Sequence, residues 1–162
     1  MADMKIAENG RTYRYNTPQL SPGGSPLWPF GFGLSFTEFS LSYSGDPSLL
    51  LTPASPTIQL SVRVTNTGSR EGDEVLQTYM SPQVGSLAPP VPPYTPIRSL
   101  IFFERLRLGA GQGEDITVTL NSGMLNLTLS DGTRKPIDGN YSILFSRGVG
   151  EEINVPLTLR GW

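Results

Sequence analysis

The longest regular alternation of apolar and polar residues lies in the middle of the chain. Between residues 57 and 65 every second residue is apolar, and the residues between them are polar or charged. Successive side chains of a β-strand point to opposite faces, so this segment is predicted to be a strand with one buried and one solvated face. The side chains predicted to enter the core are Ile58, Leu60, Val62 and Val64.

Further strands are predicted on both sides of this segment. A turn at residues 66–69 leads into a second strand at 74–80, where Val75, Gln77 and Tyr79 oppose the face that carries Leu76 and Met80. Residues 104–108 are predicted to continue or pair with the strand at 97–103. The remaining predicted strands are residues 36–43, 116–120, 124–129, 141–145 and 153–159.

Glycine-rich turn signals separate these strands, and no window has the spacing of an amphipathic helix. About seven short strands with regular turn signals are typical of an antiparallel β-sandwich of the immunoglobulin type, in which two sheets share one core. The chain has no cysteine for the inter-sheet disulfide of antibody domains. The fold class predicted is therefore all-β, a fibronectin type III-like sandwich.

Residues 1–34 show no periodicity and are rich in Pro, Gly and Ser. The predicted organisation is an irregular arm over residues 1–34 followed by the sandwich over residues 35–162. The aromatic content of this arm favours packing on a surface rather than a solvated linker. A second irregular segment, residues 82–96, contains six prolines and Tyr94 and is predicted to form an extended excursion.

Composition excludes several classes of function. Twelve basic and fourteen acidic residues provide no basic face for nucleic acid. The absence of His and Cys removes the commonest general base, thiol nucleophile and transition-metal ligands, so no cofactor or metal is expected. No apolar run has membrane-spanning length and no apolar leader opens the chain, so no membrane partner is expected and the compartment is not indicated.

Three motifs together resemble the carboxy-terminal fibronectin type III-like domain of glycoside hydrolase family 3. Residues 28–39 read WPFGFGLSFTEF, residues 64–79 read VTNTGSREGDEVLQTY, and residues 100–111 read LIFFERLRLGAG. Upstream, GRTYRY at residues 10–15 is similar to a segment near the end of the preceding α/β domain, notably in β-xylosidases and β-glucosidases. The resemblance covers nearly the whole chain and weakens after Leu120.

The resemblance implies a non-catalytic accessory domain of an enzyme that hydrolyses β-linked xylosides or glucosides by a retaining mechanism. In this family the catalytic carboxylates lie in a barrel domain and an α/β domain, which this chain does not contain. The chain's own adjacent carboxylates, such as Asp73 and Glu74, are neighbours in strands and point to opposite faces. Catalysis by the chain alone is therefore not expected, and an autonomous carbohydrate- or protein-binding module is the alternative.

The expected partners are the barrel and α/β domains of the parent enzyme, with an oligo- or polysaccharide as a second candidate. Parents in this family are often secreted or cell-wall associated. Tyr94 is the candidate for the substrate entrance, because its long loop can reach a neighbouring active site. The sequons at Asn126 and Asn140 are candidate N-glycosylation sites. The candidates for the domain interface are Arg11, Tyr13, Tyr15, Trp28, Phe30 and Phe32.

Overall fold

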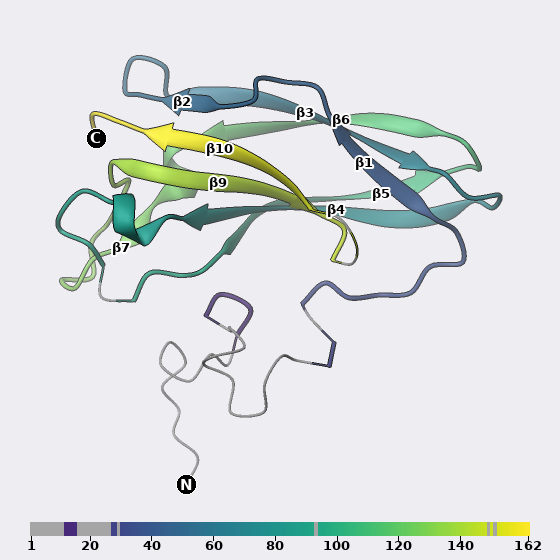
Figure 1. The fold of residues 1–162 in the computed structure, drawn as a ribbon, viewed down its shortest axis with the longest axis horizontal. Coiled ribbons are helices and arrows are strands. Elements are labelled where there is room, and N and C mark those ends of the chain that lie inside the picture. The colour runs from purple at the N-terminus through teal and green to yellow at the C-terminus, as the bar shows by residue number, and fades with distance from the viewer. Residues whose placement is uncertain (1–11, 16–26, 29, 93, 149, 151) are drawn as a thin grey trace, which may run out of the picture.

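The computed structural model describes residues 12–15, 27–28, 30–92, 94–148, 150 and 152–162, and these residues form a two-layered β-sandwich (Figure 1). One layer is a three-stranded antiparallel sheet in the order β1-β3-β6. The other is a five-stranded sheet in the order β2-β10-β9-β4-β5. The strands are β1 (Phe39–Tyr43), β2 (Leu49–Leu51), β3 (Thr57–Asn66), β4 (Gly72–Pro82), β5 (Ser99–Leu108), β6 (Gly113–Asn121), β9 (Gly139–Ser146) and β10 (Ile153–Leu159).

The core lies between the two sheets and follows the predicted alternation. In β3, Leu60, Val62 and Val64 are buried and Ile58 packs against the core, which confirms the predicted face. In β4, Leu76 and Met80 face the core from the opposite sheet. Tyr79 is also buried, but it does not belong to this core cluster. The all-β sandwich is therefore confirmed, and Tyr79 must be covered from outside the sandwich.

Some element predictions need correction. The segments predicted at 97–103 and 104–108 form one strand, β5, which begins at Ser99, so the prediction of a continuation was correct and its start was two residues early. The predicted strand at 124–129 is instead a 3₁₀ turn, η2 (Ser122–Leu125), followed by the short strand β7 (Leu127–Thr128), which pairs with β8 (Arg134–Lys135). The short β2 was missed, and it runs parallel to β10 in an otherwise antiparallel sheet. Elements of two or three residues are too short for an alternation to reveal them.

The proline-rich segment lies against the sandwich in its first half. A 3₁₀ turn, η1 (Val84–Ser86), leads to Leu87, which is buried in the core, and the Ala88 amide donates to the Asp138 carbonyl at 2.7 Å. In the second half Val91 and Tyr94 are exposed, whereas Pro92 and Pro96 are buried. Only part of the segment is therefore the excursion that the prolines predicted. Among the described residues, no helix is long and apolar enough to cross a membrane.

Candidate domain interface and the arm that builds it

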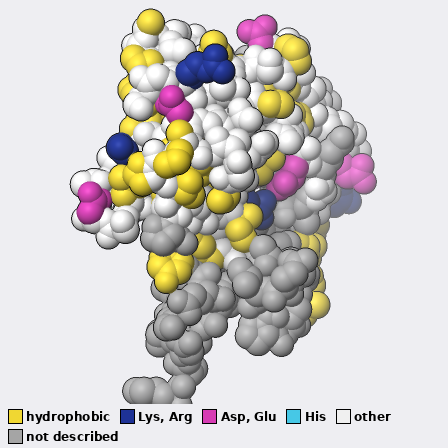
Figure 2. Space-filling model, turned by 60° about the vertical axis from the view of Figure 1, so that its left-hand side comes forward, with side chains coloured by type: hydrophobic (Ala, Val, Ile, Leu, Met, Phe, Trp, Pro, Cys, Tyr) yellow, Lys and Arg dark blue, Asp and Glu magenta, His cyan; other side chains and the backbone are white. Residues whose placement is uncertain are grey.

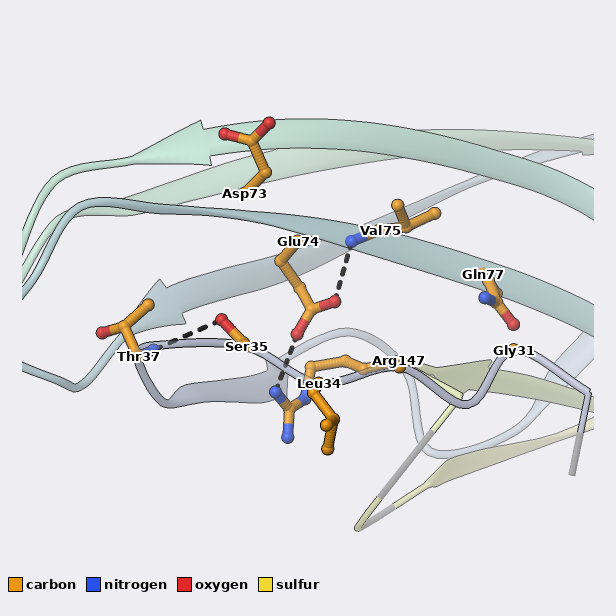
Figure 3. Close-up of a pocket in the computed structure, with 10 residues that line it drawn as sticks. Gly31, Leu34, Ser35, Thr37, Asp73, Glu74, Val75, Gln77 and Arg147 are labelled. Carbon is orange, nitrogen blue, oxygen red and sulfur yellow. Dashed lines mark hydrogen bonds and ion pairs between the residues drawn. The ribbon is translucent and has the colours of Figure 1, made fainter. Parts of the chain in front are cut away.

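The described end of the arm runs along β4 and encloses a groove of about 370 Å³ (Figure 3). On one side lie the arm's Gly31, Leu34 and Ser35, and on the other lie side chains of β4. Figure 1 shows the same stretch passing beneath the strands before it turns into β1. The complete lining is Gly31, Gly33, Leu34, Ser35, Thr37, Asp73, Glu74, Val75, Gln77 and Arg147.

Two glycines set how closely the arm approaches the sandwich. Gly148 has a φ of +78°, and a Cβ added there would lie 1.9 Å from the Gly31 carbonyl oxygen. Gly31 itself has a φ of +84°, and a Cβ there would lie 2.6 Å from the Gln77 side-chain oxygen. Both positions therefore have a left-handed backbone that favours glycine, and at Gly148 the contact with the Gly31 backbone also leaves no room for a side chain. The alternation of Gly and Phe in the arm thus has a structural reason at Gly31.

An aromatic cluster covers Tyr79 on the outer face of the five-stranded sheet. The Tyr13 ring stacks on Phe30 with centroids 4.3 Å apart, and both rings meet Tyr79 edge-on at 6.0 and 6.5 Å. The Arg98 guanidinium lies 4.9 Å from the Tyr79 centroid and pairs with Glu152 at 3.0 Å. Burial raises the pKa of the Tyr79 phenol. The arm's aromatics, and not the sandwich core, therefore bury Tyr79.

Backbone hydrogen bonds hold the first described part of the arm in the same place. The Ile97 amide donates to the Arg14 carbonyl at 2.6 Å, and the Leu100 amide donates to the Tyr13 hydroxyl at 3.2 Å. Both amides belong to the chain that enters or forms β5, an edge strand with unpaired groups. Residues 12–15 thus cover the start of this edge.

A shielded ion pair lies at the other end of the groove. Arg147 donates to a Glu74 carboxylate oxygen at 2.8 Å, and the second oxygen accepts from the Val75 amide at 2.9 Å. The two side chains are only 18% and 15% exposed. The neighbouring Asp73 points away from Glu74 in Figure 3 and pairs instead with Arg105. Each carboxylate has its own arginine, and the two do not converge on one point as a glycosidase pair would.

Asn66 connects the end of the arm to both sheets. Its amide nitrogen donates to the carbonyls of Arg70 and Leu108, at 2.7 and 2.9 Å, and its oxygen accepts from the Thr37 hydroxyl at 2.8 Å. No residue from 66 to 68 has a positive φ, so this turn does not need glycine for a left-handed backbone. Gly68 is instead required for close approach, because a Cβ there would lie 2.2 Å from the Thr37 hydroxyl.

Large apolar side chains remain exposed around the arm. Trp28 packs on Phe32 with centroids 4.6 Å apart and is still 64% exposed. Leu34 and Phe36 are more than nine-tenths exposed, at 93% and 94%. On β5, Phe103 is 64% exposed beside a shallow apolar groove whose other lining residues are Leu100, Ile101 and Phe102. Exposed apolar area of this extent, spread over one region, is typical of a protein–protein contact surface.

Tyr94 lies in a second pocket, at the end of the sandwich where the proline-rich segment returns. This pocket has a volume of about 240 Å³ and lies between residues 14–15 of the arm, residues 94–96 of the proline-rich segment, and the β7–β8 hairpin. Figure 2 looks onto this side of the molecule, where separate acidic and basic side chains lie among hydrophobic and uncharged polar ones. The lining residues are Arg14, Tyr15, Tyr94, Pro96, Asn126, Leu127, Thr128 and Arg134.

The structure thus divides the predicted interface residues into two groups. Tyr13, Phe30, Trp28 and Phe32 lie in or beside the arm's contacts with β4 and β5, whereas Tyr15 lies in the pocket of Tyr94. Arg11 lies outside the described residues.

The two candidate glycosylation sites differ in exposure. The Asn126 side chain is half-buried, whereas Asn140 is exposed and its amide oxygen accepts a hydrogen bond from Thr158 at 3.2 Å. If either sequon is used, we expect it to be Asn140.

Sequence reasoning missed the two arginines that support the arm's contacts. Arg98 and Arg147 lie outside the three motifs, and their partners Glu152 and Glu74 are 54 and 73 residues away along the chain. One signal was available, because Gln77 and Tyr79 are motif residues on the face of the strand that lies opposite Leu76 and Met80. Among the described residues no three acidic side chains come together as a metal site would require.

Comparison with known proteins places these features in a family. No model of a known protein family matches the chain. It is 33% identical over 114 residues to a periplasmic β-glucosidase of Salmonella typhimurium and 35% identical over 121 residues to a β-xylosidase of Formosa agariphila. These matches cover 67% and 74% of this chain but only 13% and 16% of the two relatives. The chain therefore corresponds to a small part of the relatives' length.

Solved structures support the same placement at the level of the fold. A crystal structure of a β-glucosidase from Listeria innocua in complex with glucose superimposes with a TM-score of 0.75 at 22% identity. The match covers 98% of this chain and 22% of that one. In sequence and fold, the chain thus belongs to the fibronectin type III-like domains of glycoside hydrolase family 3 β-glucosidases and β-xylosidases.

Proposed function

We propose that this chain is a non-catalytic accessory domain that stabilises the catalytic domains of a family 3 glycoside hydrolase. The proposed parent activity is hydrolysis of β-linked xylosides or glucosides. The observation that carries the proposal is the exposed apolar surface formed by the arm and the outer face of β5. Leu34, Phe36 and Phe103 lie there with most of their side-chain surface in contact with solvent.

The charge distribution around that surface also fits a contact between domains. Arg105 and Arg107 follow Phe103 on β5 and pair with Asp73 and Glu71 across the strand, at the rim of the apolar area. Protein interfaces typically have an apolar centre and a polar rim. We propose that the arm, residues 1–34, leads from the catalytic domains to the sandwich, residues 35–162, and that both carry the contact.

A chimera tests this function directly. The matching segment of the Formosa agariphila β-xylosidase is replaced by this chain, and melting temperature and xyloside turnover are measured. We expect an active chimera that loses several degrees of melting temperature when Leu34 and Phe103 are changed to Ser. Leu50→Ser is the matched control, because Leu50 is an exposed leucine on β2, at the opposite edge of the sheet.

Two results would contradict the proposal. Equal melting temperatures for the double variant and the Leu50→Ser control would show that the arm and β5 carry no contact. Turnover of aryl β-xylosides or β-glucosides by the isolated chain would show that it is catalytic by itself. We expect no turnover, because Asp73 and Glu74 are each paired with a separate arginine.

A further inference from the structure

The pocket around Tyr94 has walls from three segments that are distant in sequence. Arg14 and Tyr15 come from the arm, Tyr94 and Pro96 from the end of the proline-rich segment, and Arg134 from β8. A pocket of about 240 Å³ is smaller than the ~300–1,000 Å³ typical of sites for drug-sized ligands. Its size therefore suits one compact unit, such as a single sugar residue.

The walls of the pocket are held in place by the fold. The Arg14 carbonyl accepts from the Ile97 amide at 2.6 Å, which ties the arm to the proline-rich segment. On the hairpin side, Leu127 is buried in the core and Thr128 pairs with Arg134 across the two strands. A ligand that enters the pocket therefore meets groups whose backbones are already ordered, which lowers the entropic cost of binding.

Among the described residues that line the pocket, both charged side chains are cationic. Arg14 and Arg134 contribute two guanidinium groups, and no described lining residue carries a carboxylate. The acid of the hairpin turn, Asp131, instead accepts hydrogen bonds from the Thr133 amide and hydroxyl, at 2.9 and 2.7 Å. Arginine is well suited to carboxylate ligands because its planar fork donates two parallel hydrogen bonds. The pocket is thus complementary to an anion.

The remaining lining residues suit a hydroxylated ring. Tyr15 and Tyr94 provide aromatic surface together with polar hydroxyls, and the Arg14 guanidinium lies 5.9 Å from the Tyr15 centroid. Asn126 and Thr128 add polar side chains to the lining.

We infer that this pocket is a subsite for an acidic sugar, with the carboxylate of a uronic acid residue between Arg14 and Arg134. The inference deepens the proposed function by naming a saccharide class that the accessory domain itself contacts. The choice of a sugar as the ligand rests on the proposed function. The choice of a negatively charged sugar rests on the two arginines. Sugar binding is measured on this chain alone and the domain contact is measured in the chimera, so the two can fail independently.

Calorimetric titration of the full 162-residue chain with glucuronate tests the inference. Glucose and acetate serve as probes for the ring alone and the carboxylate alone. We expect glucuronate to bind at least tenfold more tightly than either probe, and to bind more weakly as salt is raised.

Arg14→Gln and Arg134→Gln are each expected to weaken glucuronate binding about tenfold, which is the loss of one charge-assisted contact. Arg70→Gln is the matched control, since Arg70 is an exposed arginine in the β3–β4 turn and does not line the pocket.

Each other outcome would overturn the inference. If the wild-type chain did not bind glucuronate, the pocket would not be a binding site for an acidic sugar. Acetate binding as tight as glucuronate binding would show an anion site with no sugar recognition, and equal glucose binding would show that the arginines do not select charge. An unchanged affinity in both arginine variants, with folding verified by circular dichroism, would place the bound sugar elsewhere.

Discussion

At the scale of single residues, Val62 lies between the two sheets with no exposed surface, on the face that the alternation of residues 57–65 predicted. Its neighbour Ser61 is exposed on the other face of the same strand. Because the two positions share a strand and differ mainly in the face they occupy, they separate the effect of burial from the effect of strand propensity.

Val62→Asp is expected to lower the free energy of unfolding by about 4 kcal/mol or more, because it places an unpaired carboxylate in the core. Ser61→Asp is the control, and we expect a change within about 0.5 kcal/mol. Urea unfolding followed by tyrosine and tryptophan fluorescence measures both. Similar stabilities of the two variants would show that the face assignment is wrong.

Tyr141 makes stability depend on alkaline pH. It is fully buried, its hydroxyl donates to the Ile137 carbonyl at 2.7 Å, and burial raises its pKa to about 12. The folded state therefore retains the proton more tightly than the unfolded state, in which the pKa is about 10. The resulting contribution, about 2–3 kcal/mol, is complete below pH 10 and is lost as the pH rises from 10 to 12.

Tyr141→Phe tests this linkage. At pH 8 the variant should be about 1 kcal/mol less stable, because the Ile137 carbonyl loses its donor. Between pH 10 and 12 its stability should fall less steeply than that of the wild type. Some slope should persist, since burial also raises the pKa of Tyr43 and Tyr79. Parallel curves for the two proteins in this range would exclude Tyr141 as the group responsible.

At the scale of elements, the arm is held to the sandwich by close backbone approach and aromatic stacking, and it lies beside a shielded ion pair that joins β4 to the end of β9. Gly148 permits the approach, Tyr13 and Phe30 stack over Tyr79, and Arg147 pairs with Glu74. None of these contacts joins residues that are close in the sequence. Two predictions separate the contribution of the glycine from that of the ion pair.

Gly148→Ala is expected to displace the arm, because the new Cβ would overlap the Gly31 carbonyl. Gly132→Ala is the control, since Gly132 also has a left-handed φ, +83°, but has nothing within 4 Å of an added Cβ. The free energy of unfolding of each variant should fall by about 1–2 kcal/mol because alanine disfavours the left-handed backbone conformation. Only Gly148→Ala should also speed hydrogen exchange at the Ile97 and Leu100 amides, which donate to the arm. Unchanged exchange at those amides would contradict the role assigned to Gly148.

Arg147→Ala is expected to cost about 2–3 kcal/mol of stability, because it leaves the Glu74 carboxylate shielded from water and without its cation. Arg105→Ala is the control on the same sheet, where the arginine is well exposed, and about 0–1 kcal/mol is expected. Thermal unfolding at low salt measures both variants. Equal losses would show that solvent shielding does not distinguish the two ion pairs.

At the scale of the whole molecule, large apolar side chains are exposed at residues 27–36 and at Phe103 of β5, while the shared core is closed. We therefore expect the isolated chain to self-associate as its concentration rises. Light scattering coupled to gel filtration measures this, and Leu34→Ser with Phe36→Ser should restore a monomer, whereas the control Leu50→Ser should not. A wild-type chain that stays monomeric at high concentration would weaken the case for a contact surface.

The sequence by itself determined the sandwich, most of its long strands and the face of each that enters the core. The physical reason is that strand alternation is a local property, visible within residues 57–65 or 74–80 alone. Its motifs also indicated the family. Strands of two or three residues, such as β2 and β8, lay below the length at which alternation can be recognised.

Only the tertiary structure decided what the arm covers and what surrounds Tyr94. The stacking of Tyr13 on Phe30 over Tyr79 and the pairing of Arg147 with Glu74 join segments far apart in the chain, and so does the pocket that Arg14 and Arg134 both line. Such contacts depend on how the two sheets place their outer faces and ends in space. No local pattern of apolar and polar residues encodes that placement, because side chains on an outer face alternate in the same way whether or not another segment covers them.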